Sequence, residues 1–280
     1  MRAISANKVS EIVKGLCIKA NLVLRSDVLN ALKAACLREK NTRAKRLLRL
    51  IIKNADIARD KKIAICQDTG MPVVFVEIGQ DVRVSGDFKK AINRGVEAGY
   101  RKASLRNSII SDPLSRGSPK YSPVIIHTDI VRGSKIKITV LPKGFGCENK
   151  SALKMFLPTA KIGDIKNFII DVAEKSGPDA CPPYIVGVGI GGTADYAGLL
   201  AKKALLRKIE RKGLIPKGTV PVFERELLSE INKLNIGPMG LGGKTTALGV
   251  NIETYPTHIA GLPVAVNISC HALRSATATL

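Results

Sequence analysis

The sequence predicts an α/β protein in which mixed β-sheets are flanked by α-helices and a helical N-terminal region covers about residues 1–60. Two observations lead to this prediction. Apolar residues recur at helical spacing through the first sixty residues, whereas later apolar runs are rich in β-branched residues and end near Gly or Pro. Some of these runs are continuously apolar and one alternates, which favours mixed over purely parallel sheets. Without an internal repeat or a low-complexity linker, the 280 residues are expected to form one domain, 1–280.

The helices are predicted from apolar stripes. Residues 5–39 are predicted to form one or two amphipathic helices, and a third is expected from Asn41 or Thr42 through residue 55. Cys17 and Cys36 lie on the apolar stripes of the first region, so we interpret both as packing residues. Further helices are expected over residues 88–100, 151–156, 162–174, 194–207 and 220–234.

The strands are predicted from short apolar runs. Residues 63–65 and 73–78 bracket the sequence Cys-Gln-Asp-Thr-Gly-Met-Pro at 66–72, where Gly and Pro favour a tight bend. Residues 124–128 and 136–141 are expected to pair, and His127 in the first run is interpreted as a packed strand residue. Later strands are expected over residues 184–190, 247–252 and 264–268.

Composition and charge limit the class of protein. We find no signal peptide, no apolar run of about 18 residues that could span a membrane, and no CxxC pair among six cysteines, so we expect a cytoplasmic protein. The net charge of +22 suits nucleic acid, an acidic partner subunit or small anionic substrates. The most basic run, residues 37–50, lacks interleaved aromatic residues. An acidic partner or substrate is therefore the simpler account, and nucleic-acid binding is the alternative from a different class.

Two glycine motifs nearly match nucleotide-binding patterns. Residues 187–192 fit GxGxxG, but the region that should hold a second strand ending in an acidic residue, 202–212, is a polar helical run with Glu210 between two basic residues. Residues 237–246 resemble a P-loop, but the pattern requires glycine at position 238, which is Pro238. We expect the second loop to let backbone approach a prosthetic group or a partner chain.

Three cysteines stand at predicted junctions between elements: Cys66, Cys181 and Cys270. Zinc usually takes four ligands from short-spaced pairs, which this sequence lacks. An iron–sulfur cube accepts thiolates that are far apart in sequence, and three of them would leave one iron open as a Lewis acid toward a substrate hydroxyl or carboxylate. Such a centre would suit the addition or removal of water beside a carboxylate. The alternative is that all three cysteines are buried packing residues.

Several separated motifs, in the same order, resemble those of the class I (iron–sulfur) fumarate hydratases and L-tartrate dehydratases. They are the residues at 66–70, Lys-Gly-Phe-Gly-Cys-Glu-Asn-Lys at 143–150, Cys-Pro-Pro at 181–183, the glycine-rich stretches at 187–193 and 237–246, and Ser-Cys-His at 269–271. The resemblance runs from about residue 8 to the end and is to the α-subunit. It implies a hydro-lyase half that reversibly hydrates fumarate to L-malate, with L-tartrate dehydration as the alternative. It also implies a separate β-subunit and an α2β2 assembly.

The resemblance implies ligands for the cofactor and the substrate. Cys66, Cys181 and Cys270 would hold a [4Fe-4S] cluster whose fourth iron faces the substrate. Gln67 and Arg106 would bind carboxylates of the C4 dicarboxylate substrate, because an arginine fork matches a carboxylate well.

The resemblance also implies the groups that handle protons. Asp68 and His258 would form the proton-delivering pair, and Gly146 would offer a backbone N–H to the substrate. His271 is the less favoured acid, because it could instead tune the cluster or simply pack. The base that removes the C3 proton is expected on the β-subunit. Position 147 is Cys where the family often has Ser, which leaves a fourth thiol near the site.

Overall fold

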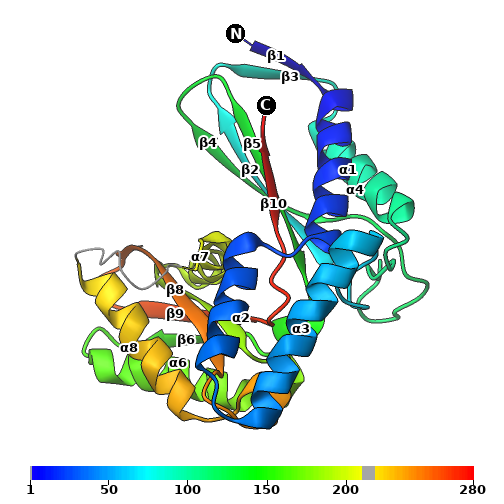
Figure 1. Ribbon diagram of the computed structural model, residues 1–280. Coiled ribbons are helices and arrows are strands. Elements are labelled where there is room, and N and C mark those ends of the chain that lie inside the picture. The colour runs from blue at the N-terminus through cyan, green and yellow to red at the C-terminus, as the bar shows by residue number, and fades with distance from the viewer. Residues whose placement is uncertain (1, 210–217) are drawn as a thin grey trace. The chain divides into compact units, whose positions relative to one another are not determined.

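After a short first strand, three helices make up most of residues 6–61 of the computed structural model, and strands mixed with helices follow (Figure 1). The structure describes residues 2–209 and 218–280. The predicted helical region is formed by α1 (Ala6–Leu22), α2 (Ser26–Arg38) and α3 (Thr42–Lys61), and both larger sheets are mixed, so the predicted fold class is confirmed. No helix of the described residues is long and apolar enough to cross a membrane.

The chain divides into two compact units, each with its own sheet and core. Unit 1 consists of Met1–Arg25, Asn54–Phe145 and Arg274–Leu280, and unit 2 of Ser26–Lys53 and Gly146–Leu273. The single domain expected over 1–280 stays a prediction.

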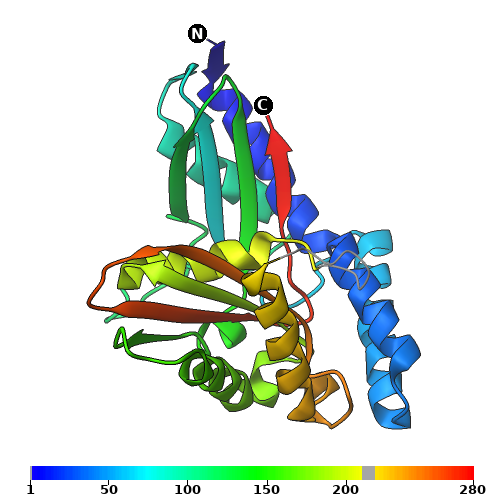
Figure 2. The same ribbon diagram turned by 90° about the vertical axis from the view of Figure 1, so that its left-hand side faces the viewer.

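The sheet of unit 1 has the strand order β10-β5-β2-β4. Its strands are β2 (Met71–Gly79), β4 (Ile125–Val131), β5 (Ile136–Lys143) and β10 (Ala276–Thr279). β2 is parallel to β4 and antiparallel to β5, and the register pairs Val74 with Val140. These side chains pack with those of α1 and of α4 (Phe88–Lys102), which lie together along the sheet (Figure 2). A short parallel pair, β1 (Arg2–Ser5) and β3 (Val82–Ser85), completes the unit.

The sheet of unit 2 has the strand order β6-β9-β7-β8. Its strands are β6 (Ala152–Phe156), β7 (Tyr184–Gly192), β8 (Ala247–Thr257) and β9 (Leu262–Ser269). Side chains of α6 (Ile162–Ser176) and α8 (Thr219–Lys233) form one core with Val186 and Val188 of β7. Because side chains alternate along a strand, Gly187 and Gly189 lie on the opposite face, which packs against α7 (Ala194–Leu206).

The glycines of the GxGxxG match are explained by this helix packing. A β-carbon on Gly187 would lie 2.2 Å from the carbonyl oxygen of Ala201, and one on Gly189 would lie 2.1 Å from that of Ala197. Only glycine allows α7 to approach β7 so closely. The sequence argument against a dinucleotide site used the polar run 202–212. Its last residues, 210–212 with Glu210, lie outside the described residues.

The loop that resembles a P-loop is likewise anchored inside unit 2. The buried Glu39 accepts a hydrogen bond from the Lys244 N–H at 2.8 Å, and a β-carbon on Gly243 would lie 2.6 Å from that of Ala44. The side chain of Ala44, in α3 of this chain, therefore accounts for the close approach at Gly243. An approach of the loop to a prosthetic group or a partner stays a prediction.

Three sequence-based expectations about strands and helices are wrong. Residues 63–65 form no strand. The Ile65 N–H donates to the carbonyl of Asn21, and the Ile65 carbonyl accepts from the side chain of Asn54, so neither group is left for a strand partner. β4 and β5 do not pair, because the more buried β2 lies between them. Residues 152–156 form the edge strand β6 rather than a helix, and the helix before it, α5 (Phe145–Glu148), has only four residues.

Candidate active site

The segment from residue 65 to residue 70 is held in place by side chains of unit 1. Asn54 Nδ2 donates to the Ile65 carbonyl at 2.9 Å, and the hydroxyl of the buried Tyr100 donates to the carbonyls of Thr69 and Gly70 at 2.9 and 3.3 Å. Burial raises the pKa of this hydroxyl, so it remains a donor throughout the physiological range. The loop before β2 is therefore fixed by long-range hydrogen bonds rather than by regular secondary structure.

The carboxylate of Asp68 is oriented by two backbone donors. The Gly70 N–H donates to Oδ1 at 2.9 Å, and the Phe145 N–H donates to Oδ2 at 2.8 Å. The carbonyl of Asp68 accepts a 2.7 Å hydrogen bond from Arg274 Nη2. A carboxylate held in this way has a defined direction, which a group that orients an acid or base requires.

Three predicted residues share the neighbourhood of Asp68 in unit 1. The half-buried Cys66 lies with its sulfur 3.4 Å from Oε1 of the exposed Gln67. Thr69 links the loop to Arg106, because its hydroxyl accepts from the Arg106 N–H at 3.1 Å and donates to the Arg106 carbonyl at 3.2 Å. The exposed guanidinium of Arg106 has no ion pair with another described residue. An amide and a cation are therefore available to an anionic ligand.

Two of the predicted thiolate ligands lie at the same end of two neighbouring inner strands of the sheet of unit 2. Cys181 precedes β7 and Cys270 follows β9, and these strands are antiparallel, with Ile185 opposite Ser269. Cys181 adopts a left-handed conformation, with φ 51°, rather than the extended one that a following proline favours. Its carbonyl accepts the Nδ1–H of His271 at 2.9 Å, so the neutral ring leaves Nε2 as an acceptor.

The fourth thiol, Cys147, joins these two segments. Its buried sulfur accepts the Cys270 N–H at 3.1 Å and donates to the carbonyl of Ala180 at 3.6 Å. A serine hydroxyl could make both hydrogen bonds, so cysteine and serine would both fit this position. Gly146, beside it in α5, has an exposed backbone.

His258 lies at the exposed turn between β8 and β9. The Ala260 N–H donates to its Nδ1 at 3.2 Å, which places the proton of the neutral ring on Nε2. The ring can thus present an N–H donor away from its own turn. His258 belongs to unit 2 and Asp68 to unit 1, and their pairing stays a prediction.

The donor chemistry fits an iron–sulfur cluster. None of the six cysteines forms a disulfide, and Cys66, Cys181 and Cys270 are all half-buried, whereas Cys17 and Cys36 are buried packing residues as expected. Among the described residues, no group of three or more His, Cys, Asp or Glu side chains is close enough to hold a metal ion. The convergence of the three thiols on one cluster stays a prediction.

Sequence reasoning missed the residues that support the loop at 65–70. Arg274, Tyr100, Asn54 and Asn21 come from four different segments, and no motif contains them together. The only local signal is polarity, because Asn21 is fully buried at the end of the apolar stripe of α1.

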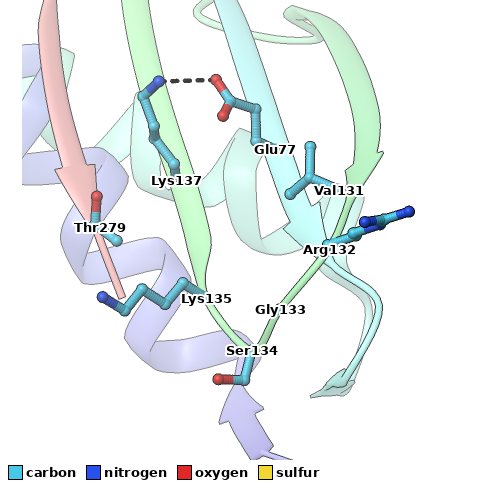
Figure 3. A pocket seen from close by; sticks show the side chains of 8 residues that line it. All are labelled: Glu77, Val131, Arg132, Gly133, Ser134, Lys135, Lys137 and Thr279. Atoms are coloured by element: carbon cyan, nitrogen blue, oxygen red, sulfur yellow. Dashed lines mark hydrogen bonds and ion pairs between the residues drawn. The ribbon is translucent and has the colours of Figure 1, made fainter.

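A separate pocket of about 410 Å³ lies at the far end of β2, around the turn between β4 and β5 (Figure 3). The ion pair between Lys137 Nζ and Glu77 Oε1, at 2.9 Å, spans one side of it. No predicted site residue is among those that line this pocket.

Comparison with known proteins defines the class. A family model described as "Fumarate hydratase (Fumerase)" matches residues 10–279. The chain therefore belongs to the fumarate hydratase family of hydro-lyases. It is 43% identical to the "Putative L(+)-tartrate dehydratase subunit alpha" of Methanocaldococcus jannaschii, over 96% of each chain. It is 31% identical to the "L(+)-tartrate dehydratase subunit alpha" of Escherichia coli strain UTI89, over 98% of this chain and 91% of the relative.

Proposed function

We propose that this chain is the α-subunit of an iron–sulfur hydro-lyase that reversibly hydrates fumarate to L-malate together with a separate β-subunit. The observation that carries the proposal is the grouping of Cys66, Gln67, Asp68 and Arg106 around one fixed loop in a member of the fumarate hydratase family. The net charge of +22 suits a dianionic substrate and an acidic partner. The α2β2 assembly remains part of this proposal.

In this proposal Cys66, Cys181 and Cys270 would hold a [4Fe-4S] cluster, which would supply a Lewis acid for the hydroxyl that is added or lost. The guanidinium of Arg106 and the amide of Gln67 bind a substrate carboxylate, with the Gly146 N–H as a further donor. Asp68 and His258 form the proton-delivering pair, with the Nε2–H of His258 as its hydrogen-bond donor and the carboxylate of Asp68 as the group that orients it. The base for the C3 proton comes from the β-subunit.

The names of the relatives favour a second substrate. Both are called tartrate dehydratase α-subunits, so L-tartrate dehydration is the second candidate. Malate and tartrate differ by one hydroxyl. Because the β-subunit also contributes to the proposed pocket, the contacts that separate the two substrates are divided between two chains.

The test is an activity assay on the anaerobically reconstituted complex with its β-subunit, with iron and sulfide quantified. We expect a brown protein that hydrates fumarate. High turnover of L-tartrate with negligible turnover of fumarate would reverse the order of the two substrates. A colourless protein that binds duplex DNA with a steep salt dependence would overturn the proposal in favour of nucleic-acid binding.

A paired substitution tests the carboxylate-binding role of Arg106. Arg106→Gln removes a charge-assisted hydrogen bond worth about 1.5–3 kcal/mol, so KM should rise about 10- to 150-fold. The matched control, Arg116→Gln, changes an exposed arginine in the same loop region and should leave KM unchanged. Equal KM values for the two variants would remove Arg106 from the site.

A further inference from the structure

Arg274 is a buried cation that the proposed chemistry leaves unassigned. Its side chain is only 3% exposed, and among the described residues it forms no ion pair with a carboxylate. Its Nε is buried without a hydrogen-bond partner. Burying a guanidinium in this way is unfavourable, so its place in the fold calls for a reason beyond stability.

The two hydrogen bonds that Arg274 makes point to that reason. Nη2 donates to the Asp68 carbonyl at 2.7 Å, and Nη1 donates to Asn21 Oδ1 at 3.3 Å. Asn21 is itself fully buried and fixed, because its Nδ2 donates to the Cys17 carbonyl at 3.0 Å and its backbone oxygen accepts from the Ile65 N–H at 3.0 Å. The guanidinium thus connects the main chain of Asp68 to the end of α1.

The neighbouring backbone leaves room for this arrangement. A β-carbon on Gly144 would lie 3.2 Å from Asp68 Oδ2 and 3.9 Å from Arg274 Nη2. The carboxylate and the guanidinium therefore both border Gly144, and a side chain there would press on the carboxylate. The next residue, Phe145, donates its N–H to the same Oδ2.

We propose that Arg274 is a positioning residue for Asp68, whose main chain it holds so that the carboxylate keeps one direction. This inference rests on the proposed role of Asp68. This positioning role requires the planar guanidinium of arginine, because its two Nη nitrogens reach two acceptors on different segments, the Asp68 carbonyl and Asn21 Oδ1. A lysine at position 274 keeps the charge but cannot span both acceptors.

The first test uses the full-length chain and needs no cofactor. Two amides report the position of the carboxylate, because Gly70 and Phe145 donate to its two oxygens. In Arg274→Lys we expect both amides to exchange their hydrogens about tenfold faster or more, as a lost charged hydrogen bond allows. The matched control is Arg94→Lys, whose guanidinium bridges α4 to Asn7 and Ser10 in the same unit. It should leave both exchange rates unchanged. Unchanged rates in Arg274→Lys would overturn the proposal.

The second test measures kinetics of the reconstituted complex. Arg274→Lys should lower kcat about 10- to 100-fold with little change in KM, since misplacing a catalytic group has costs of this order. In an Asp68→Ala background the same substitution should have no further effect on kcat. If Asp68→Ala alone retains full activity, the proposed role of Asp68 fails. If Asp68→Ala is inactive but Arg274→Lys is normal, the positioning role fails.

A milder variant keeps the inference testable if Arg274→Lys does not fold. Asn21→Ala removes the acceptor of Nη1 and leaves the hydrogen bond to Asp68 in place. We expect faster exchange at Gly70 and Phe145 by a smaller factor than in Arg274→Lys. Wild-type exchange at both amides would contradict the role of the fork.

Discussion

Replacing Tyr100 by Phe removes one hydroxyl from beneath the loop at 65–70. Tyr100 is 2% exposed, and its hydroxyl is the donor to two buried carbonyls, those of Thr69 and Gly70. The phenyl ring retains the packing in the core of unit 1. The variant therefore isolates the hydrogen bonds from the hydrophobic contribution.

The expected cost follows from the acceptors that are left behind. A buried carbonyl that loses its donor destabilises the native state by about 1–3 kcal/mol, and the two carbonyls share a single hydroxyl proton, so the cost is counted once. This corresponds to a roughly 5- to 150-fold larger unfolding constant. Urea denaturation followed by circular dichroism measures it, and hydrogen exchange at Gly70 reports the loop directly.

The control variant changes Tyr121, whose ring packs against that of Tyr100. Tyr121 packs edge-on against Tyr100 at 6.3 Å, and no hydrogen bond of its hydroxyl to another described residue is present. Tyr121→Phe should change the free energy of unfolding by less than about 0.5 kcal/mol. If Tyr100→Phe is as stable as Tyr121→Phe, the hydroxyl does not hold the loop and the reasoning is wrong.

Three further predictions concern residues outside this loop. Burial raises the pKa of the Cys17 thiol from 9.0 to about 12. The unfolded chain therefore releases this proton at a lower pH than the folded chain does. The free energy of unfolding should fall as pH rises above about 9, by up to ~1.4 kcal/mol per pH unit. Cys17→Ala should flatten this slope in urea titrations at successive pH values, and an unchanged slope would exclude Cys17 as its source. Gly189→Ala should lower the free energy of unfolding by about 1–3 kcal/mol or more, because the new methyl group clashes with the carbonyl oxygen of Ala197. The matched variant is Gly198→Ala in α7, where a β-carbon would meet nothing within 4 Å, and it should raise the free energy of unfolding by up to about 1 kcal/mol. Calorimetry that ranks the two glycine variants the other way would refute the packing account. Cys17→Ala and Cys36→Ala should retain the iron content of the reconstituted protein and Cys270→Ser should lose it, and iron loss from either of the first two would show that the ligands are misassigned.

The helices were the part of the fold that the sequence predicted best. The stripes at 5–39, 162–174 and 220–234 became α1, α2, α6 and α8, because a 3.6-residue period specifies both a helix and its buried face. The strands were found more reliably than their partners. Nothing in the short runs at 124–128 and 136–141 indicates that β2 lies between them, since pairing depends on burial in the assembled sheet.

The site divides in the same way. The roles expected of Cys66, Gln67, Asp68 and Arg106 came from the family resemblance, and unit 1 brings these residues together. Cys181 and Cys270 were named from their places at predicted strand junctions, and the antiparallel pairing of β7 with β9 explains why they lie at the same end of the sheet.

By itself, the sequence determined the α/β class and the family, and it named the residues that we propose to carry the chemistry, because these are matters of composition, period and motif. Only the tertiary structure revealed which groups hold those residues still. The hydrogen bond from Arg274 to Asp68 joins positions 206 residues apart, and that from Tyr100 to Thr69 joins positions 31 apart. A local sequence pattern cannot predict such hydrogen-bond partners. A buried acceptor is satisfied by whichever donor the packing of distant segments brings within about 3 Å of it.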